Sequence, residues 1–229
     1  MLACFTTRLS SSASPTTSQK RQRKEITDAF HKNLYDICQA EQEGGLIQVE
    51  FPAALVPKQC ACAAHLFPKA RHVDMPEWLD TADADTPANA LLLFKCIQVA
   101  MDAGQIFFSY NASAQQYEMQ LLDKSLCHET MRDAGNRMCY DFTALIPSRL
   151  AQTTWQELQD QALQFQGGHV PDERCMDFRA RLAVLKAESE GWVPPGTVDI
   201  PDNPSESEYK ERMRMFFDTM GPKQDPELF

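Results

Sequence analysis

Two cysteines and a histidine lie close together in the stretch CACAAH, as Cys60, Cys62 and His65. Thiolates and imidazoles are ligands of zinc and copper, so these residue types indicate a candidate metal site. A closed zinc site takes four ligands and usually has two to four residues between its cysteines, so Cys-x-Cys with one histidine is an incomplete match. His72 is a candidate fourth ligand. The competing interpretation is that both thiols pack as small apolar side chains.

A second thiol lies beside an imidazole at Cys127 and His128. Adjacent residues on a helix point about 100° apart, so this pair would not face each other as a nucleophile and its base. The chain also lacks the phosphate-binding motifs GxGxxG and GxxxxGK[ST], the nucleophile motif GxSxG and the metalloprotease motif HExxH. We therefore predict that the protein is not an enzyme.

The first 24 residues differ in charge from the rest of the chain. Residues 1–24 hold five basic residues, nine serines or threonines and no acidic residue. Leu2, Phe5 and Leu9 would share one face of a short helix, near Arg8. This composition is typical of an organelle targeting segment, and the early arginine favours a mitochondrial over a plastid address. A basic binding arm around KRQRK and a polar tail without a role are the alternatives.

The remaining residues are strongly acidic. They include 17 basic and 32 acidic residues, a formal charge of −15. Such a charge repels phosphate backbones and anionic lipids, so we expect no direct binding to nucleic acid. The longest apolar run, ALLLFKCIQVAM, contains Lys95 and is shorter than the ~18–20 residues of a membrane-spanning helix. We therefore expect protein partners, in a complex that is soluble or peripheral to a membrane.

Apolar periodicity predicts an α+β fold that is mainly helical, with a small antiparallel sheet and extended arms at both ends. Alternating apolar and polar residues predict a strand near 46–51 and a hairpin near 105–122, and the Pro-punctuated segment 57–85 is expected to be irregular. Spacing and capping residues predict helices over residues 25–42, 87–103, 125–135, 154–166, 172–190 and 205–220. Cys38 falls within the apolar stripe of the first of these helices.

These elements indicate a single α+β domain over residues 25–191, preceded by the targeting-like segment 1–24 and followed by a Pro-rich arm over 192–229. The stretch GWVPPGTVDIPDNPS holds four prolines in fifteen residues, so a stiff extended connector is expected. The helix after it would present an apolar stripe to a partner protein or fold back on its own domain. The stripe consists of Tyr209, Met213, Phe216, Phe217 and Met220.

Together these patterns favour a non-catalytic accessory subunit of a large mitochondrial complex. The acidic domain suits a peripheral subunit of the respiratory chain or of ATP synthase better than an RNA-facing ribosomal protein. One alternative is a small metal-binding protein or enzyme that uses Cys60, Cys62 and His65 with zinc or copper; no other cofactor is expected. The second is a free-standing adaptor or secreted effector, and a plastid or cytoplasmic location also stays open.

Overall fold

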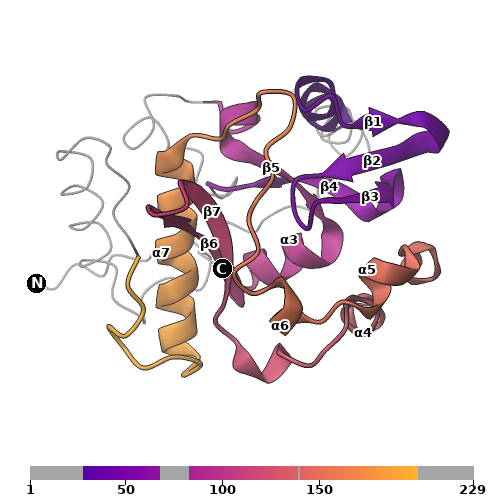
Figure 1. Cartoon of the computed structure of the whole chain (residues 1–229). Coiled ribbons are helices and arrows are strands. Elements are labelled where there is room, and N and C mark those ends of the chain that lie inside the picture. The colour runs from indigo at the N-terminus through magenta and orange to yellow at the C-terminus, as the bar shows by residue number, and fades with distance from the viewer. Residues whose placement is uncertain (1–27, 68–82, 139, 201–229) are drawn as a thin grey trace, which may run out of the picture.

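Short antiparallel strands and helices of varied length build the computed structural model, which describes residues 28–67, 83–138 and 140–200 (Figure 1). The predicted α+β class is confirmed. The strands are β1 (Glu41–Gln42), β2 (Leu46–Val49), β3 (Ala54–Pro57), β4 (Ala61–His65), β5 (Ala90–Phe94), β6 (Ile106–Asn111) and β7 (Gln116–Leu121). The helices are residues 28–37 and α3 (Lys95–Asp102), α4 (Met131–Arg137), α5 (Ser148–Gln152), α6 (Trp155–Leu158) and α7 (Glu173–Ser189).

The strand predicted near residues 46–51 is confirmed as β2, which pairs antiparallel with β1 on one side and β3 on the other. Beyond its end the chain runs beside β5. The N–H of Glu50 donates to the carbonyl of Leu92 at 2.7 Å, and Phe51 forms a parallel bridge with Leu93. These backbone contacts link the sheet of β1, β2 and β3 to the sheet of β4 and β5.

Two predictions between residues 57 and 103 are wrong. The segment expected to be irregular contains β4, which pairs antiparallel with β5. The expected helix over 87–103 is a strand in its first half and becomes helical only as α3. All five side chains of β5 are buried, and such a short apolar run fits a fully buried strand as well as a buried helix. The pairing with β4 selects the strand.

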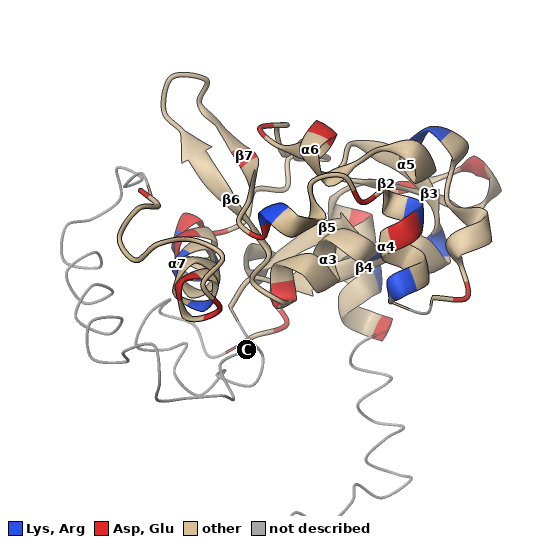
Figure 2. Ribbon diagram, turned by 90° about the horizontal axis from the view of Figure 1, so that it is seen from below, with Lys and Arg blue, Asp and Glu red and all other residues tan. Residues whose placement is uncertain are grey.

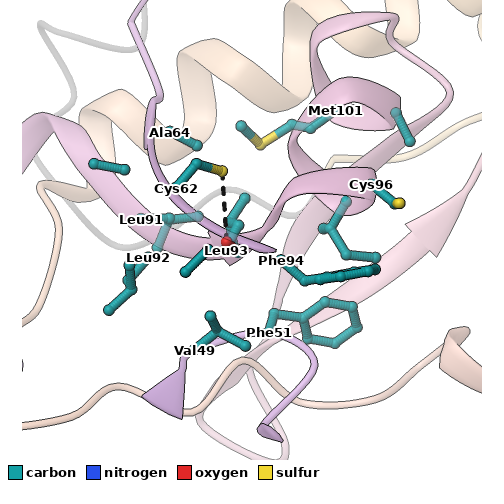
Figure 3. Packing of buried hydrophobic residues seen from close by; sticks show 14 of the residues in the cluster. Val49, Phe51, Cys62, Ala64, Leu91, Leu92, Leu93, Phe94, Cys96 and Met101 are labelled. Carbon is teal, nitrogen blue, oxygen red and sulfur yellow. Dashed lines mark hydrogen bonds between the residues drawn. The ribbon is translucent and has the colours of Figure 1, made fainter. Parts of the chain in front are cut away.

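The main hydrophobic core surrounds β5 and draws side chains from several elements. Figure 3 shows, beside the residues of β5 itself, Val49, Phe51, Cys62, Ala64, Cys96 and Met101. Burial raises the pKa of both Cys62 and Cys96, in the case of Cys96 to about 12. These two thiols are therefore protonated at neutral pH and pack as small apolar groups.

The hairpin predicted near 105–122 is confirmed as β6 and β7, whose register runs from Ile106↔Leu121 to Asn111↔Gln116. Helix α7 lies along this hairpin (Figure 1). Its predicted position is also confirmed, and the carboxylate of Asp172 accepts a hydrogen bond from the Arg174 N–H at the helix start.

The capping box predicted at Thr154 and Glu157 is confirmed, but the helix it opens is short. Helix α6 ends at Leu158, whereas the sequence pattern predicts a helix to residue 166. The reason is pairing of the following residues with β7: the Leu163 N–H donates to the Tyr117 carbonyl at 2.8 Å. Sheet hydrogen bonds thus replace the helical ones from about residue 159 onward.

The segment directly after α7 packs on the domain. Trp192, Val193, Val198 and Ile200 contact a small apolar cluster that α7 forms with Phe107 and Leu122. Other predicted features lie outside the described residues. They are the segment 1–24, His72 and the stripe of Tyr209, Met213, Phe216, Phe217 and Met220.

Acidic and basic positions are interspersed on α4 and α7, as Figure 2 shows. Within the described ranges, no helix combines the length and the apolar character that crossing a membrane requires.

Candidate functional site

The predicted metal-binding residues Cys60, Cys62 and His65 come from one strand and the turn before it. Cys60 ends a 3-10 helix, while Cys62 and His65 belong to β4. Side chains three residues apart in a strand point to opposite faces of the sheet. Cys62 and His65 therefore point to opposite faces of the sheet. Residues of an irregular segment, as predicted for 57–85, would not be restricted in this way.

Each of these residues has its own surroundings. The thiol of Cys62 donates to the carbonyl of Leu93 at 3.4 Å (Figure 3). His65 Nε2 lies 2.9 Å from a carboxylate oxygen of Asp85, and its ring stacks on Phe30 with 4.5 Å between centroids. Burial raises the pKa of Cys60, which keeps its thiol protonated. The structure thus does not bring the three into one ligand group.

A different set of potential ligands meets in the interior. Within residues 28–67, 83–138 and 140–200, one group of three or more Cys, His, Asp or Glu side chains offers ligand atoms that all lie within 4.8 Å of one another. It consists of Cys38, Glu50 and His169. Glu50 is completely buried, and Cys38 and His169 are 1% and 4% exposed. We call this group the Cys–Glu–His cluster.

Three separate segments supply the cluster. Cys38 follows the helix of residues 28–37, and Glu50 follows β2. His169 lies in the loop before α7, which is fixed at one end by the Gln164 N–H donating to the carbonyl of Glu50. At the other end the Asp172 N–H donates to the carbonyl of Ala88.

Gly167 allows this loop to approach the helix end. Its φ is +58°, and a Cβ built there would lie 2.2 Å from the carbonyl oxygen of Ile37. No side chain fits that space, so glycine is required for the loop to pass directly against the backbone before Cys38. The close passage places His169 beside Cys38 and Glu50.

Hydrogen bonds orient both the imidazole and the carboxylate. His169 Nδ1 lies 2.7 Å from Glu50 Oε1, and Nε2 lies 3.0 Å from the carbonyl oxygen of Pro87. Since a carbonyl can only accept, Nε2 carries a hydrogen. The second carboxylate oxygen of Glu50 accepts the Leu92 N–H at 2.8 Å. The Cys38 thiol donates to Glu50 Oε1 over 3.9 Å.

The electrostatics of the cluster favour a paired state. Burial alone would lower the pKa of His169, but hydrogen bonds with Cys38 and Glu50 outweigh burial and raise the pKa to about 10. Burial raises the pKa of the Cys38 thiol. At neutral pH the cluster without a metal is therefore an imidazolium–carboxylate pair beside a neutral thiol.

This arrangement suits a nucleophile poorly. Catalytic cysteines have a lowered pKa and often lie at the positive N-terminal end of a helix, whereas Cys38 follows the C-terminal end and has a raised pKa. Nδ1 of His169 faces Glu50 and not an open space for a substrate, and all three side chains are buried. The cluster can instead tie three segments together or hold a metal ion.

The described surface also has a groove of about 660 Å³ beside β3. Its lining comes from residues 52–55, from α5 with the residues flanking it, and from residues 158–164. Arg149 is the charged side chain in this lining. Leu55 lies on the groove and is 43% exposed, so an apolar side chain faces solvent there.

The strand at this groove has an open edge. The Gln48 N–H donates to the Ala40 carbonyl, on the side of β1. In an antiparallel ladder a residue directs its N–H and C=O to the same neighbour, so Gln48 and its partner Leu55 are a non-hydrogen-bonded pair. The N–H and C=O of Leu55 therefore point to the outer edge of β3, where no described strand pairs.

Sequence reasoning missed the cluster and the groove. It read Cys38 as part of an apolar stripe and Glu50 as the polar side of an alternating strand. His169 stands 119 residues from Glu50, a separation that no local pattern bridges. The pair Gly167-Gly168 just before His169 was the available signal, because adjacent glycines often mark a close backbone approach.

Comparison with known proteins adds no family to this description. No protein-family model, curated protein or solved structure matches the chain.

Proposed function

We propose that the chain is a non-catalytic accessory subunit that binds other proteins in a larger mitochondrial assembly, as a peripheral subunit of the respiratory chain or of ATP synthase. The observation that carries the protein-binding part is the groove beside the open edge of β3. The mitochondrial part is supported by the basic, acid-free composition of residues 1–24, and the acidic remainder supports protein rather than RNA partners.

The groove suits an extended segment of a partner protein. Such a segment would pair with the N–H and C=O of Leu55, in the manner of an added strand. Pro57 ends β3 and has no N–H, so the pairing would be short and would depend on side chains as well. An apolar side chain of the partner would cover Leu55, and an acidic one would reach Arg149.

Native gel electrophoresis of the endogenous, epitope-tagged protein tests this proposal. Migration with a large complex from a mitochondrial fraction is the expected result. A species near 25.9 kDa would contradict the subunit proposal and favour a free-standing adaptor. Recovery in the cytosol or the medium would contradict the mitochondrial part.

A variant at the groove assigns the surface. Leu55→Glu places a charge where an apolar contact is expected, so we expect the variant to fold and to leave the complex. Val170→Glu is the matched control, because Val170 is also apolar, is 66% exposed and does not line the groove. Equal retention of both variants in the complex would show that partners bind elsewhere.

A further inference from the structure

We propose that Cys38, Glu50 and His169 bind a divalent ion of the zinc class through one thiolate, one carboxylate oxygen and one imidazole nitrogen. The site goes beyond the proposed function, because the ion would tie together the three segments that supply its ligands. The three ligand atoms already lie within 4.8 Å of one another. Zinc accepts this mixture of donors, whereas Mg²⁺ prefers oxygen alone and Cu(I) prefers sulfur.

Two of the three separations between the ligand atoms are near those of a zinc site, and the third lies within 4.8 Å. Bonds of about 2.0 Å to nitrogen or oxygen and about 2.3 Å to sulfur place tetrahedral ligands roughly 3.3–3.5 Å apart. The Sγ–Oε1 distance of 3.9 Å is slightly longer, and the Nδ1–Oε1 distance of 2.7 Å is shorter. Shifts of roughly half an ångström in side chains would bring both distances into range.

The surroundings already orient the ligands as a metal would need them. A metal-binding histidine usually donates its second ring N–H to a carbonyl or carboxylate, and His169 Nε2 does so to Pro87. This bond leaves Nδ1 as the nitrogen that faces Cys38 and Glu50. The carboxylate of Glu50 is likewise held by the Leu92 N–H through the oxygen that does not face the imidazole.

Charge balance is kept when the ion binds. A divalent cation with one thiolate, one carboxylate and one neutral imidazole has a net charge of zero, as has the metal-free cluster, so binding adds no unpaired charge to the interior. The ion would take the place of two protons, one on the Cys38 sulfur and one on His169 Nδ1. Three protein ligands leave one coordination position for a small ligand such as water.

Metal analysis of the full chain tests the proposal. We expect about one zinc per chain after purification without chelators and with any affinity tag removed. After chelation, titration with Co²⁺ should give the near-ultraviolet charge-transfer band of a cobalt–thiolate bond. Cys38→Ser should lose this band. Cys62→Ser is the matched control, a buried cysteine with a carbonyl partner outside the cluster, and it should keep the band.

X-ray absorption at the zinc edge tests the same site without any variant, in case Cys38→Ser does not fold. One sulfur neighbour at about 2.3 Å with nitrogen or oxygen neighbours at about 2.0 Å is expected. Two sulfur neighbours, or a band lost in Cys62→Ser and kept in Cys38→Ser, would assign the metal to Cys60 and Cys62 instead. Absence of stoichiometric zinc together with no cobalt–thiolate band would leave a metal-free ion pair and overturn the proposal.

Discussion

At the scale of single residues, substitution of Asn89 tests how much stability its buried hydrogen bonds contribute. Asn89 is completely buried; its side chain accepts the Phe67 N–H at 2.6 Å and donates to the carbonyls of Phe67 and Ala84. Asn89→Ala leaves these backbone groups without partners and without water. We expect a loss of about 3 kcal/mol in the free energy of unfolding, measured with urea.

Asn111 provides the control for this substitution. Its side chain also makes several hydrogen bonds, to the N–H groups of Ser113 and Ala114 and to Glu118, but in a hairpin turn near solvent. Water can replace these partners, so Asn111→Ala should cost about 1 kcal/mol or less. Equal losses for the two variants would contradict the account of Asn89.

The residue scale also shows why the Cys–Glu–His cluster escaped sequence reasoning. Local patterns placed Cys38 on the buried face of a helix over 25–42 and Glu50 within a strand near 46–51, whereas Cys38 directly follows the helix of residues 28–37 and Glu50 directly follows β2. They could not show that a distant loop covers the polar side of that strand and buries Glu50. The metal site predicted in CACAAH, by contrast, rested on spacing alone. In the structure most of these residues form a strand, whose side chains alternate between two faces and so do not converge on one ion.

At the scale of elements, the loop before α7 predicts different costs for two adjacent glycines. Gly167→Ala introduces a Cβ that meets backbone atoms of Ile37 and Cys38 and also strains a φ of +58°. Gly168→Ala strains a φ of +79° but has nothing within 4 Å of the added carbon. We expect losses of about 3 kcal/mol or more for Gly167→Ala and about 1 kcal/mol for Gly168→Ala, from urea unfolding.

A similar loss of stability in both variants would mean that backbone strain, not close packing, causes the loss. The loop would then be able to move away from the helix. The cobalt–thiolate band of the Cys–Glu–His cluster is a second measurement that distinguishes close packing from strain. Gly167→Ala should also weaken any cobalt–thiolate band, because it displaces the loop that holds His169. Gly168→Ala should leave that band in place.

Elements with clear periodicity or capping residues were predictable, and buried ones were not. The hairpin of β6 and β7 and the helix α7 follow from alternation, from helical spacing and from turn residues. β5 did not, because ALLLF has no polar face from which a period can be read. The capping box predicted where α6 begins, but its early end depends on pairing with β7, a contact that local sequence does not contain.

At the scale of the whole molecule, buried polar side chains join segments that are distant in the sequence. The side chain of Glu50 is hydrogen-bonded to β5 and to the loop before α7. The side chain of Asn89 is hydrogen-bonded to Phe67, which follows β4, and to Ala84. Arg179 of α7 pairs with Asp102 at the end of α3. These links, added to the apolar core around β5, fix how the small sheets lie relative to α7, which none of the sheets could do alone.

Packing after α7 indicates where the domain ends and the C-terminal arm begins. Trp192 packs on the apolar cluster of α7, so Trp192→Ala should lower the free energy of unfolding by about 1–2 kcal/mol. Circular dichroism is the suitable probe, because the substitution removes a fluorophore. Pro195→Ala, at an exposed position of the same segment, should change the stability by less than about 0.5 kcal/mol. Indistinguishable variants would return residues 192–200 to the arm; the expected difference assigns them to the domain.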